Sequence, residues 1–444
     1  MGLRRSLTIS PGRTVLFSVI TAISIGTALL MLPVAQRVPI SFIDCLFTAT
    51  SSACVTGVLT IPFDSFTLVG KSIILALIQI GGIGLLTLWL FLISLFVNLG
   101  ISTHFMIGQV FELAALKNPK RIVFFIIGFT LAVELIGALC TYSLISHAYP
   151  PQEAAFYALF HSVSSFCNAG LSVFGHSMIP FQHNIPLLAL TAILILLGGI
   201  GFMTLFELFS YFQAKWQRKR FTFSLTTKVV LTMTVGLITM ATLFLMIIEG
   251  PRHFAQDPGW VTVSNMLFNA IAYRSIGLTT IDLTTMQTAT VFMIIMYSFI
   301  GSSPLSTGSG IRVTTFALFL ATIRAVILGR MVVELKGRRI PLDQIFKAMA
   351  VLSLCSCWII ASTFCLSLIE SHSSFITVFF EAVSSFTNLG LATDITPFLS
   401  NPGKLLIILN MFIGRVGTLT LLLALRPHRE RVDFQYPEER IMMS

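Results

Sequence analysis

Four polar runs that each end in glycine are the residues of this chain best suited to bind an ion. They read SSACVTG, SSFCNAG, YRSIG and SSFTNLG and end at Gly57, Gly170, Gly277 and Gly390. A ring of backbone carbonyl oxygens can replace the water shell of a cation, and it needs residues that adopt positive φ, which glycine does without steric cost. The alternative is that these glycines only allow helices to pack closely. We favour the cation-binding interpretation.

Each run closes a short apolar segment, and the four segments are copies of one motif, at residues 40–57, 153–170, 263–277 and 374–390. Their closing glycines are spaced by 113, 107 and 113 residues, which indicates repeated units. A second glycine follows after 24, 28, 24 and 24 residues, at Gly81, Gly198, Gly301 and Gly414. For Gly81, Gly82, Gly198 and Gly199 we favour a role in helix packing.

The elements that must position these motifs are membrane spans. The chain has 444 residues, 55% of them hydrophobic and only 10% charged, which is too apolar and too poorly charged for a soluble globular protein. Apolar stretches of about 18 residues or more can cross the hydrocarbon core of a bilayer. Eight are present, at about residues 14–33, 71–97, 122–146, 185–212, 228–248, 286–328 (interrupted), 344–369 and 403–425.

The glycine-terminated segments are too short to span and lie between two spans on the outer side, so they should enter and leave on one face. Non-helical backbone at membrane depth is tolerated only where it is buried in protein or lines a wet cavity. We therefore predict an all-α integral membrane protein with eight spanning helices, built as four helix–pore loop–helix repeats around one central pore.

The predicted organisation follows from these spans. It comprises a cytoplasmic N-terminus (1–13), repeat one (14–97), a cytoplasmic linker (98–121), repeat two (122–212), a basic cytoplasmic linker (213–227), repeat three with a broken last helix (228–329), a second basic cytoplasmic linker (330–343), repeat four (344–425) and a cytoplasmic tail (426–444).

The net charge of +10 is placed as in a membrane protein rather than in a nucleic-acid-binding one. With the N-terminus inside, twenty of the 28 Lys and Arg residues fall in inside segments and four fall outside. This is a positive-inside bias, and it predicts that both termini are cytoplasmic.

Enzyme chemistry is not indicated. The sequence contains no GxxxxGK[ST] loop, no GxGxxG after a strand and no HExxH or CxxC pair, and its seven cysteines show no metal-ligand spacing. The remaining classes are an ion-conducting pore and a secondary transporter of another cation or small solute. Many solute carriers have inverted repeats, whereas units of two spans keep the same orientation here, which favours the pore.

Several motifs in order carry a specific resemblance. They are TATSSACVTG, FHSVSSFCNAG, IGLTTID, GSSPLSTGSGIRVTTF, MFIGRVGTLT and the terminal YPEERIMMS. With them the chain resembles the Ktr/Trk/HKT superfamily of potassium transporters over nearly its whole length. Within that superfamily it is similar to KtrB-type pore subunits, because the first repeat starts near residue 14 without the two further spans usual in Trk-type subunits.

The resemblance implies a selectivity filter that acts through main-chain oxygens. Carried onto this sequence, the filter residues are Val55, Thr56, Gly57, Asn168, Ala169, Gly170, Ser275, Ile276, Gly277, Asn388, Leu389 and Gly390. In this family glycine at all four corners accompanies potassium preference, whereas serine in the first repeat marks sodium-transporting plant relatives. Gly57 therefore predicts potassium as the transported ion bound at the filter.

The resemblance also implies an intramembrane gating loop beneath the filter, with Arg415 on the pore side near it. The predicted gate residues are Gly301, Ser302, Ser303, Pro304, Leu305, Ser306, Thr307, Gly308, Ser309, Gly310 and Arg415. Glycines and a proline make a continuous helix through this loop unfavourable. The alternatives are a packing kink for the loop and a structural ion pair of Arg415 with Glu134 or Glu207.

This chain departs from the family pattern at three positions: Pro304 stands among the usual small residues of the loop, Thr418 replaces the usual Pro, and the tail ends on Ser444 instead of Gly. Among the other ionisable residues, we expect Asp44 to complement a helix N-terminus and His161 to be a hydrogen-bonded structural residue. Asp282 is either an acid at the outer mouth of the pore or a solvated loop residue. For Arg274 and Glu381 we expect buried ion pairs.

The function predicted from these features is potassium uptake through a four-loop filter gated by an intramembrane loop. The resemblance implies a homodimer in the bacterial plasma (inner) membrane, multi-pass and in contact with lipids, on a cytosolic ring of nucleotide-binding regulatory subunits. No cofactor is expected in the chain and no nucleic-acid partner. Sodium remains open as an activator or co-transported ion.

Overall fold

The computed structural model describes residues 11–84 and 119–417, and this part of the chain is mostly helical. Predictions for the remaining residues lie outside the described part of the chain. They concern the inner end of the second span at 85–97, most of the 98–121 linker, Thr418 and the tail to Ser444.

The helices follow one another in four groups, each with a first, a middle and a third helix. The first helices are α1 (Pro11–Leu30), α6 (Pro119–Ile145), α10 (Leu225–Ile248) and α15 (Leu342–Ile369). The middle helices are α2 (Phe42–Ala53), α7 (Pro151–Cys167), α12 (Gly259–Ala272) and α16 (Phe375–Thr387). The third helices are α3 (Leu68–Ile83), α8 (Ile185–Gly199), α13 (Thr288–Phe299) and α17 (Asn401–Val416).

Shorter elements connect these helices. Helix α9 (Phe202–Trp216) follows α8 and helix α14 (Val313–Ile327) follows α13. Strands β1 (Glu334–Leu335) and β2 (Arg338–Arg339) pair antiparallel in a small hairpin before α15. The remaining short helices are η1 (Pro33–Ala35), η2 (Phe63–Ser65), η3 (Ile179–Phe181), α11 (Gly250–His253), η4 (Leu283–Thr285) and η5 (Thr396–Phe398).

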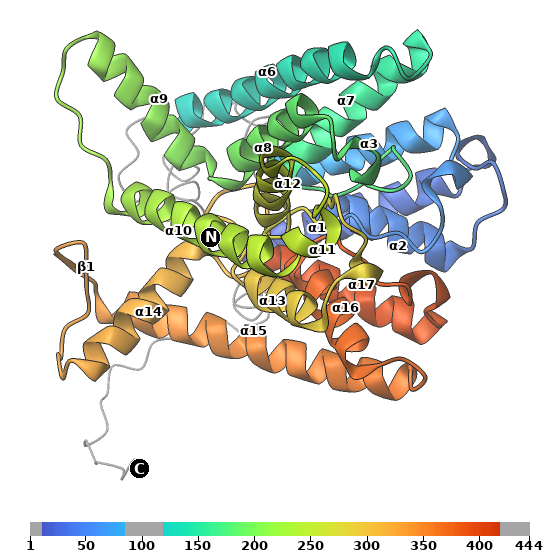
Figure 1. The fold of residues 1–444 in the computed structure, drawn as a ribbon. Coiled ribbons are helices and arrows are strands. Elements are labelled where there is room, and N and C mark those ends of the chain that lie inside the picture. Colours follow the sequence, from blue (N-terminus) through green and yellow to red (C-terminus); the bar gives the residue numbers. More distant parts are fainter. Residues whose placement is uncertain (1–10, 85–118, 418–444) are drawn as a thin grey trace, which may run out of the picture.

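The four groups are arranged in a closed ring. The third helix of each group packs against the middle helix of the next, as α3 does on α7, α8 on α12 and α13 on α16, and α17 packs back on α2. In Figure 1, α6 and α15 run along opposite outer edges of the molecule, with α2, α12 and α16 between them. The middle helices therefore approach one another in the interior.

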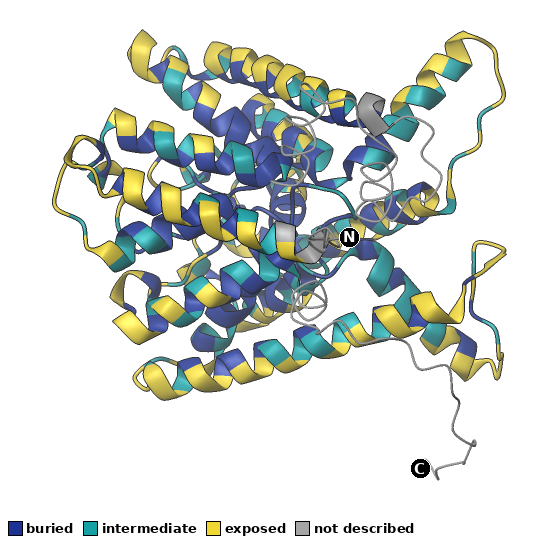
Figure 2. Cartoon of the chain, turned by 180° about the vertical axis from the view of Figure 1, so that it is seen from behind, coloured by how far each residue is buried: buried dark blue, intermediate teal, exposed yellow. Residues whose placement is uncertain are grey.

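The surface of the molecule is apolar along its outer helices. Figure 2 shows buried residues concentrated in the middle and exposed residues along the outer faces of the peripheral helices. Large apolar side chains are exposed there, among them Leu131, Leu135 and Leu139 of α6, Val235, Leu243 and Ile247 of α10, and Ile360, Phe364 and Leu368 of α15. Apolar faces this extensive are typical of contact with lipid rather than with water.

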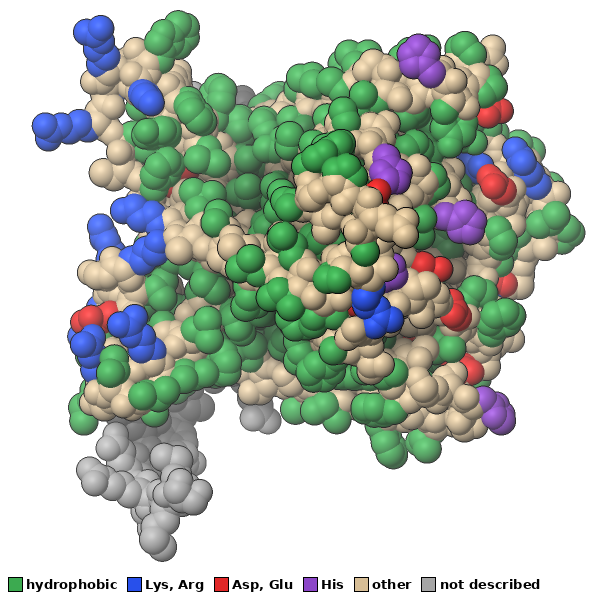
Figure 3. Space-filling model, viewed as in Figure 1, with side chains coloured by type: hydrophobic (Ala, Val, Ile, Leu, Met, Phe, Trp, Pro, Cys, Tyr) green, Lys and Arg blue, Asp and Glu red, His purple; other side chains and the backbone are tan. Residues whose placement is uncertain are grey.

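Charged side chains are separated along the molecule. In Figure 3, most of the visible Lys and Arg side chains gather at the end where α9, the β-hairpin and α14 lie, and most acidic and His side chains lie toward the other end. The basic end includes Lys215 in the last turn of α9, Lys219 and Arg220 after it, and Arg338 and Arg339 in the hairpin. This separation is the one expected of a basic cytoplasmic side.

Fewer helices than predicted are long enough to span a membrane without a break. In the described residues, three helices pass by length and composition, within α6, α10 and α15, and α8 with α9 makes a fourth if this bent pair is one span. The pair is bent by 103°. The predicted span over 185–212 is therefore bent rather than a single straight helix. The predicted interruption of 286–328 is present, since α13 ends at Phe299 and α14 begins at Val313.

Three glycines account for the shortened third helices. Gly84, Gly201 and Gly417 have φ of 86°, 95° and 84°, a left-handed conformation that ends a right-handed helix. Each lies three residues after the second glycine of its repeat. Gly417 ends α17 inside the predicted 403–425 span, so this span is not a single straight helix either. In the sequence, these glycines are the last residues of GGIG (81–84), GGIG (198–201) and GRVG (414–417). Whether such a glycine ends a helix depends on its backbone conformation, which the residue type does not specify.

Candidate functional site

Two of the middle helices, α2 and α16, begin with a serine cap, and two, α7 and α16, end in a left-handed turn. Ser41 accepts from the N–H of Asp44 at the start of α2, and Ser374 accepts from the N–H of Thr377 at the start of α16. Helices α7 and α16 end at Asn168 (φ 57°) and Asn388 (φ 52°), and asparagine tolerates this conformation better than most residues. The chain therefore turns sharply into the predicted filter segments, next to the partially negative C-terminal ends of these helices.

The four predicted filter glycines lie around one axis, each against the carbonyl oxygen of another segment. A Cβ atom added at Gly57 would come within 3 Å of the Ala169 oxygen, and one at Gly170 would do the same with the Ile276 oxygen. Added at Gly277 it would meet the Leu389 oxygen. At Gly390 it would lie 2.5 Å from the Ile276 oxygen and 2.6 Å from the Thr56 oxygen, so the fourth segment approaches both the third and the first. The contacts thus run through the four repeats and back to the first. Only glycine fits at these positions, because φ also lies between 70° and 91°.

Hydrogen bonds within each segment fix the turn that presents these carbonyl oxygens. The N–H of Thr56 donates to the Ser51 oxygen over 2.7 Å, and the N–H of Ala169 donates to the Ser164 oxygen over 2.8 Å. The equivalent bond of the fourth segment joins Leu389 to Ser384 over 2.9 Å. The hydroxyl of Thr56 is buried and has no hydrogen-bond partner among the described residues. Closely spaced backbone carbonyl oxygens are the kind of ligand that can replace the water around a cation.

The 301–310 loop packs against the break between α8 and α9. Its Ser303 and Thr307 N–H groups donate to the carbonyl oxygens of Gly199 and Gly198, both over 3.2 Å. In return the N–H of Phe202 donates to the Leu305 oxygen over 2.9 Å. Ser302, Ser303 and Thr307 have no exposed surface. The loop is therefore irregular backbone whose residues are mostly buried, rather than a connection on the surface.

Three arginines donate to the carbonyl oxygens of this loop. Arg415 donates to the oxygens of Thr307 and of Gly81. Arg312 donates to the oxygens of Ser303 and Gly308. The Nε of Arg274 donates to the oxygen of Gly301 over 3.2 Å. A guanidinium group with several fixed donors suits such convergent carbonyl groups.

Neither proposed carboxylate partner of Arg415 contacts it. Glu134 accepts a hydrogen bond from Gln79 over 2.8 Å, and Glu207 accepts from the N–H of Ser224 over 3.0 Å. The loop is the partner of Arg415 instead. Arg312 was missed by sequence reasoning, although its position directly after the loop was a usable signal.

The predicted buried ion pairs of Arg274 and Glu381 are absent from the described residues. Glu381 instead accepts hydrogen bonds from the backbone N–H of Thr393 and from the hydroxyls of Thr393 and Thr396, each over 2.6 Å. Hydroxyl and amide donors therefore satisfy a buried carboxylate for which a buried pair was expected. His161 pairs with Thr191 over 2.9 Å, which agrees with the structural role predicted for it.

The two outer acids have different surroundings. Asp44 lies in the first turn of α2, as expected, but it also pairs with Lys404 of α17 over 2.7 Å. Partial burial acts to raise the pKa of Asp44, but hydrogen bonds from Lys404, Ser41 and Thr60 and the charge of Lys404 outweigh this effect and hold the pKa below its usual value. Asp282 is exposed and caps η4, as a solvated loop acid does.

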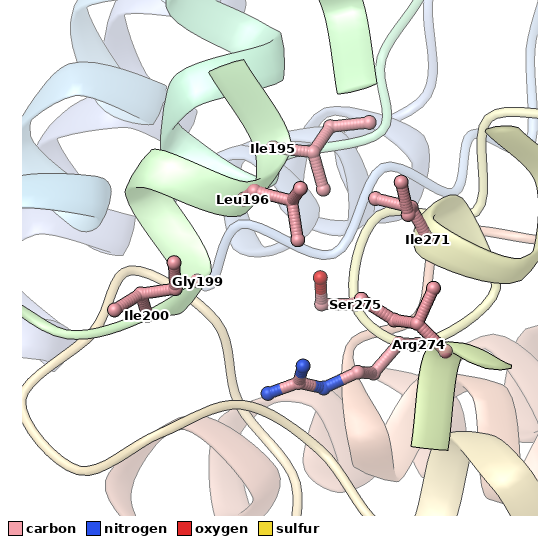
Figure 4. A pocket seen from close by; sticks show the side chains of 8 residues that line it. Ile195, Leu196, Gly199, Ile200, Ile271, Arg274 and Ser275 are labelled. Atoms are coloured by element: carbon pink, nitrogen blue, oxygen red, sulfur yellow. The ribbon is translucent and has the colours of Figure 1, made fainter. Parts of the chain in front are cut away.

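A small cavity lies beside the third filter segment. Figure 4 shows Arg274 and Ser275 facing Gly199 and Ile200 across it, with Ile195, Leu196 and Ile271 lining the rest. The cavity measures about 10 Å³, enough for one water molecule. The Nη2 of Arg274 is buried and lacks a hydrogen-bond partner among the described residues, so a water molecule here would have a donor to bind.

The second glycines lie where a side chain would collide with a middle helix. A Cβ atom at Gly81 would meet the Ala53 oxygen, one at Gly198 the Phe166 oxygen, and one at Gly82 the sulfur of Cys167. These contacts agree with the predicted packing role. At Gly199 the nearest atom would be 3.8 Å away, so close packing does not require a glycine there.

Comparison with known proteins gives concordant matches. The family model described as "TrkH: Cation transport protein" matches residues 13–432. The chain is 33% identical to Ktr system potassium uptake protein D of Bacillus subtilis (strain 168), over 98% of this chain and 97% of that protein. It is 34% identical to Ktr system potassium uptake protein B of Vibrio alginolyticus, over 97% of this chain and 94% of that protein. These relatives are transport proteins rather than enzymes.

A solved structure supports the fold. The crystal structure of the potassium transporter TrkH from Vibrio parahaemolyticus superimposes with a TM-score of 0.74, over 96% of this chain and 87% of that one. The sequence identity is 17%, so this likeness concerns the fold alone.

Proposed function

The chain belongs to the TrkH family of cation transport proteins, and from this premise we propose that it takes up potassium through a filter formed by its four glycine-turned segments. The observation that carries the proposal is the closed ring of contacts from Gly57 through Gly170, Gly277 and Gly390 back to Thr56. Four turns that bring backbone carbonyl oxygens close together supply ligands for a cation that has lost its water. Potassium uptake by the two Ktr system relatives supports this choice of ion.

The mechanism that fits this site is passive flow down the electrochemical gradient. The membrane potential supplies about 2.3 kcal/mol per elementary charge per 100 mV, so a cation is drawn inward without any reaction in this chain. The 301–310 loop is the gate, and its buried position below the ring in the described fold is the blocked state. Arg415 and Arg312 hold it there through its carbonyl oxygens.

The membrane arrangement proposed for this function has eight spans as four parallel repeats, with both termini cytoplasmic. Breaks in the third helices support it, because a broken helix can cross the membrane as two shorter pieces. The basic end around α9 and the hairpin supports a cytoplasmic side. Proteins of the Ktr and TrkH type are integral plasma-membrane proteins, and this chain is placed with them.

We extend the proposal to partners. A homodimer on a cytosolic nucleotide-binding ring fits the similarity to Ktr system proteins, and the basic end around α9 offers it a docking face. Sodium is proposed only as an activator or co-transported ion, and no cofactor is proposed in the chain.

The test is uptake of rubidium, a potassium substitute, by bacteria that lack their own potassium uptake systems. The chain is expressed with and without a ring subunit of a Ktr system, and sodium is varied. Uptake that needs all four filter glycines supports the proposal. No uptake in any condition contradicts it and favours a transporter of another cation or small solute.

A further inference from the structure

The side chain of Asn168 joins the second filter segment to the 301–310 loop. Its Nδ2 donates to the hydroxyl of Thr307 over 2.7 Å, and its Oδ1 accepts from the hydroxyl of Ser275 over 2.7 Å. All three residues are buried, so these bonds do not compete with bulk water. One amide therefore connects the second segment, the third segment and the loop.

Asn388 makes the matching contact from the fourth segment. Its Nδ2 donates to the hydroxyl of Ser309 over 3.1 Å and to the carbonyl oxygen of Cys54 over 3.0 Å. Asn388 is 1% exposed. The same residue type in the same left-handed conformation thus reaches the loop from two segments.

The two asparagines lie at opposite corners of the ring. The order of contacts around it is repeat one, two, three, four, so repeats two and four face each other. The corresponding residues of the other two segments are Val55 and Ser275, and Val55 has no polar side chain to offer. Val55 nevertheless adopts φ of 58°, which is unfavourable for a β-branched residue. A need for the left-handed turn therefore does not by itself account for asparagine at this position.

We propose that Asn168 and Asn388 couple the position of the 301–310 loop to the geometry of the filter. With the loop in place, its hydroxyls hold the two amides and with them the second and fourth segments. When the loop leaves, the amides lose these partners and opposite corners of the ring relax together. The loop thus sets ion discrimination as well as access. This inference rests on the proposed function.

The decisive experiment is a double-mutant cycle on Thr307→Val and Asn168→Gly. Valine keeps the shape of Thr307 and its backbone bonds to Gly198 and Arg415 but removes the hydroxyl, and glycine keeps the left-handed turn but removes the amide. The matched control is Thr322→Val on α14, whose hydroxyl donates only within its own helix, to Leu318. Uptake of rubidium and of radioactive sodium is measured for each variant.

Each single variant removes the bond between Asn168 and Thr307. Thr307→Val also loses the hydroxyl's bond to the Phe166 oxygen, and Asn168→Gly also loses the bond from Ser275. Each is expected to raise rubidium uptake at least about threefold, the effect of weakening the blocked state by one buried hydrogen bond. Each should also lower the ratio of rubidium to sodium uptake, whereas Thr322→Val should change neither. Because both single variants lose the same bond between Asn168 and Thr307, the double variant should raise uptake by less than the product of the two single effects. Higher uptake with an unchanged ratio, or effects that multiply, would overturn the coupling.

A thermal-melting cycle on the purified protein keeps the two proposals separate. It measures the interaction of Asn168 with Thr307 without any transport. A wild-type chain that carries no ion would contradict the proposed function, while additive melting shifts in the same four proteins would contradict the coupling itself.

Discussion

Arg312 holds the loop that precedes it, because its Nη1 lies 2.7 Å from the carbonyl oxygen of Gly308 and 3.2 Å from that of Ser303. Arg312, the N-cap residue of α14, thus ties the loop to the start of that helix, and Arg415 ties it to α17. The guanidinium groups of Arg312 and Arg415 also place positive charge at this loop, and in the proposed gate this charge would oppose the passage of a cation.

Arg312→Gln is expected to raise uptake without a regulatory partner. Hydrogen bonds from a charged donor contribute about 2 kcal/mol, so the blocked state should lose roughly tenfold or more in population relative to the open one. The control is Arg324→Gln, an exposed arginine of the same helix. Rubidium uptake checks the prediction, and equal rates for Arg312→Gln and wild type would contradict it.

Deletion of residues 305–309 is expected to raise uptake severalfold. It removes Thr307 and Ser309, which contact the two asparagines, and Leu305, which accepts from Phe202. The remaining loop is too short to fill the same space. Uptake is measured with protein amounts matched by immunoblot, and a lower rate from a correctly inserted chain would show that the loop is not the barrier.

Gly57→Ser is expected to lower the preference for potassium over sodium by about tenfold. Its side chain would press on the Ala169 oxygen, and the φ of 91° adds about 1–2 kcal/mol of strain. Competition of sodium with rubidium uptake measures the change.

Gly175→Ser separates collision from strain in that experiment. Gly175 also has a positive φ, of 71°, but a Cβ there would meet nothing within 4 Å. The Gly175→Ser variant should therefore keep the wild-type preference for potassium over sodium. An equal loss in both variants would mean that backbone strain, not the ring, accounts for the effect.

The ion pair between Asp44 and Lys404 should make stability depend on pH. Because the pKa of Asp44 is lowered in the folded protein, its contribution is fully present above the unfolded value of about 4 and is lost as the pH falls through the lower folded value. Lys404→Met should cost about 2 kcal/mol of stability at pH 7. Melting temperatures of the purified proteins from pH 7 to pH 3 should converge on acidification, and a constant difference would contradict this assignment.

The sequence was sufficient for the recurring features and insufficient for the side-chain partners. Gly57, Gly170, Gly277 and Gly390 were identifiable because a regular period and a polar context single them out, and the loop was identifiable from its glycines and Pro304. These signals are the order and type of residues along the chain, so one sequence contains them.

The partners were not identifiable because they come from distant residues. Glu381 is satisfied by Thr393 and Thr396, and Asn168 reaches Thr307 across 139 positions. Charge alone suggested buried pairs for Arg274 and Glu381. Instead, Arg274 donates to the carbonyl oxygen of Gly301, and Glu381 accepts from neutral hydroxyl and amide groups. The bend at Gly201 was overlooked for a related reason, since glycine permits a positive φ but does not require it.

The contact of α17 with α2 constrains how the protein is made. Translation proceeds from the N-terminus, so three groups of helices leave the ribosome before the segment that completes the ring exists. Until α17 is inserted, α2 lacks a neighbour on one side and Asp44 lacks Lys404. A nascent chain that stops before residue 401 would therefore leave one side of α2 and the carboxylate of Asp44 without their partners.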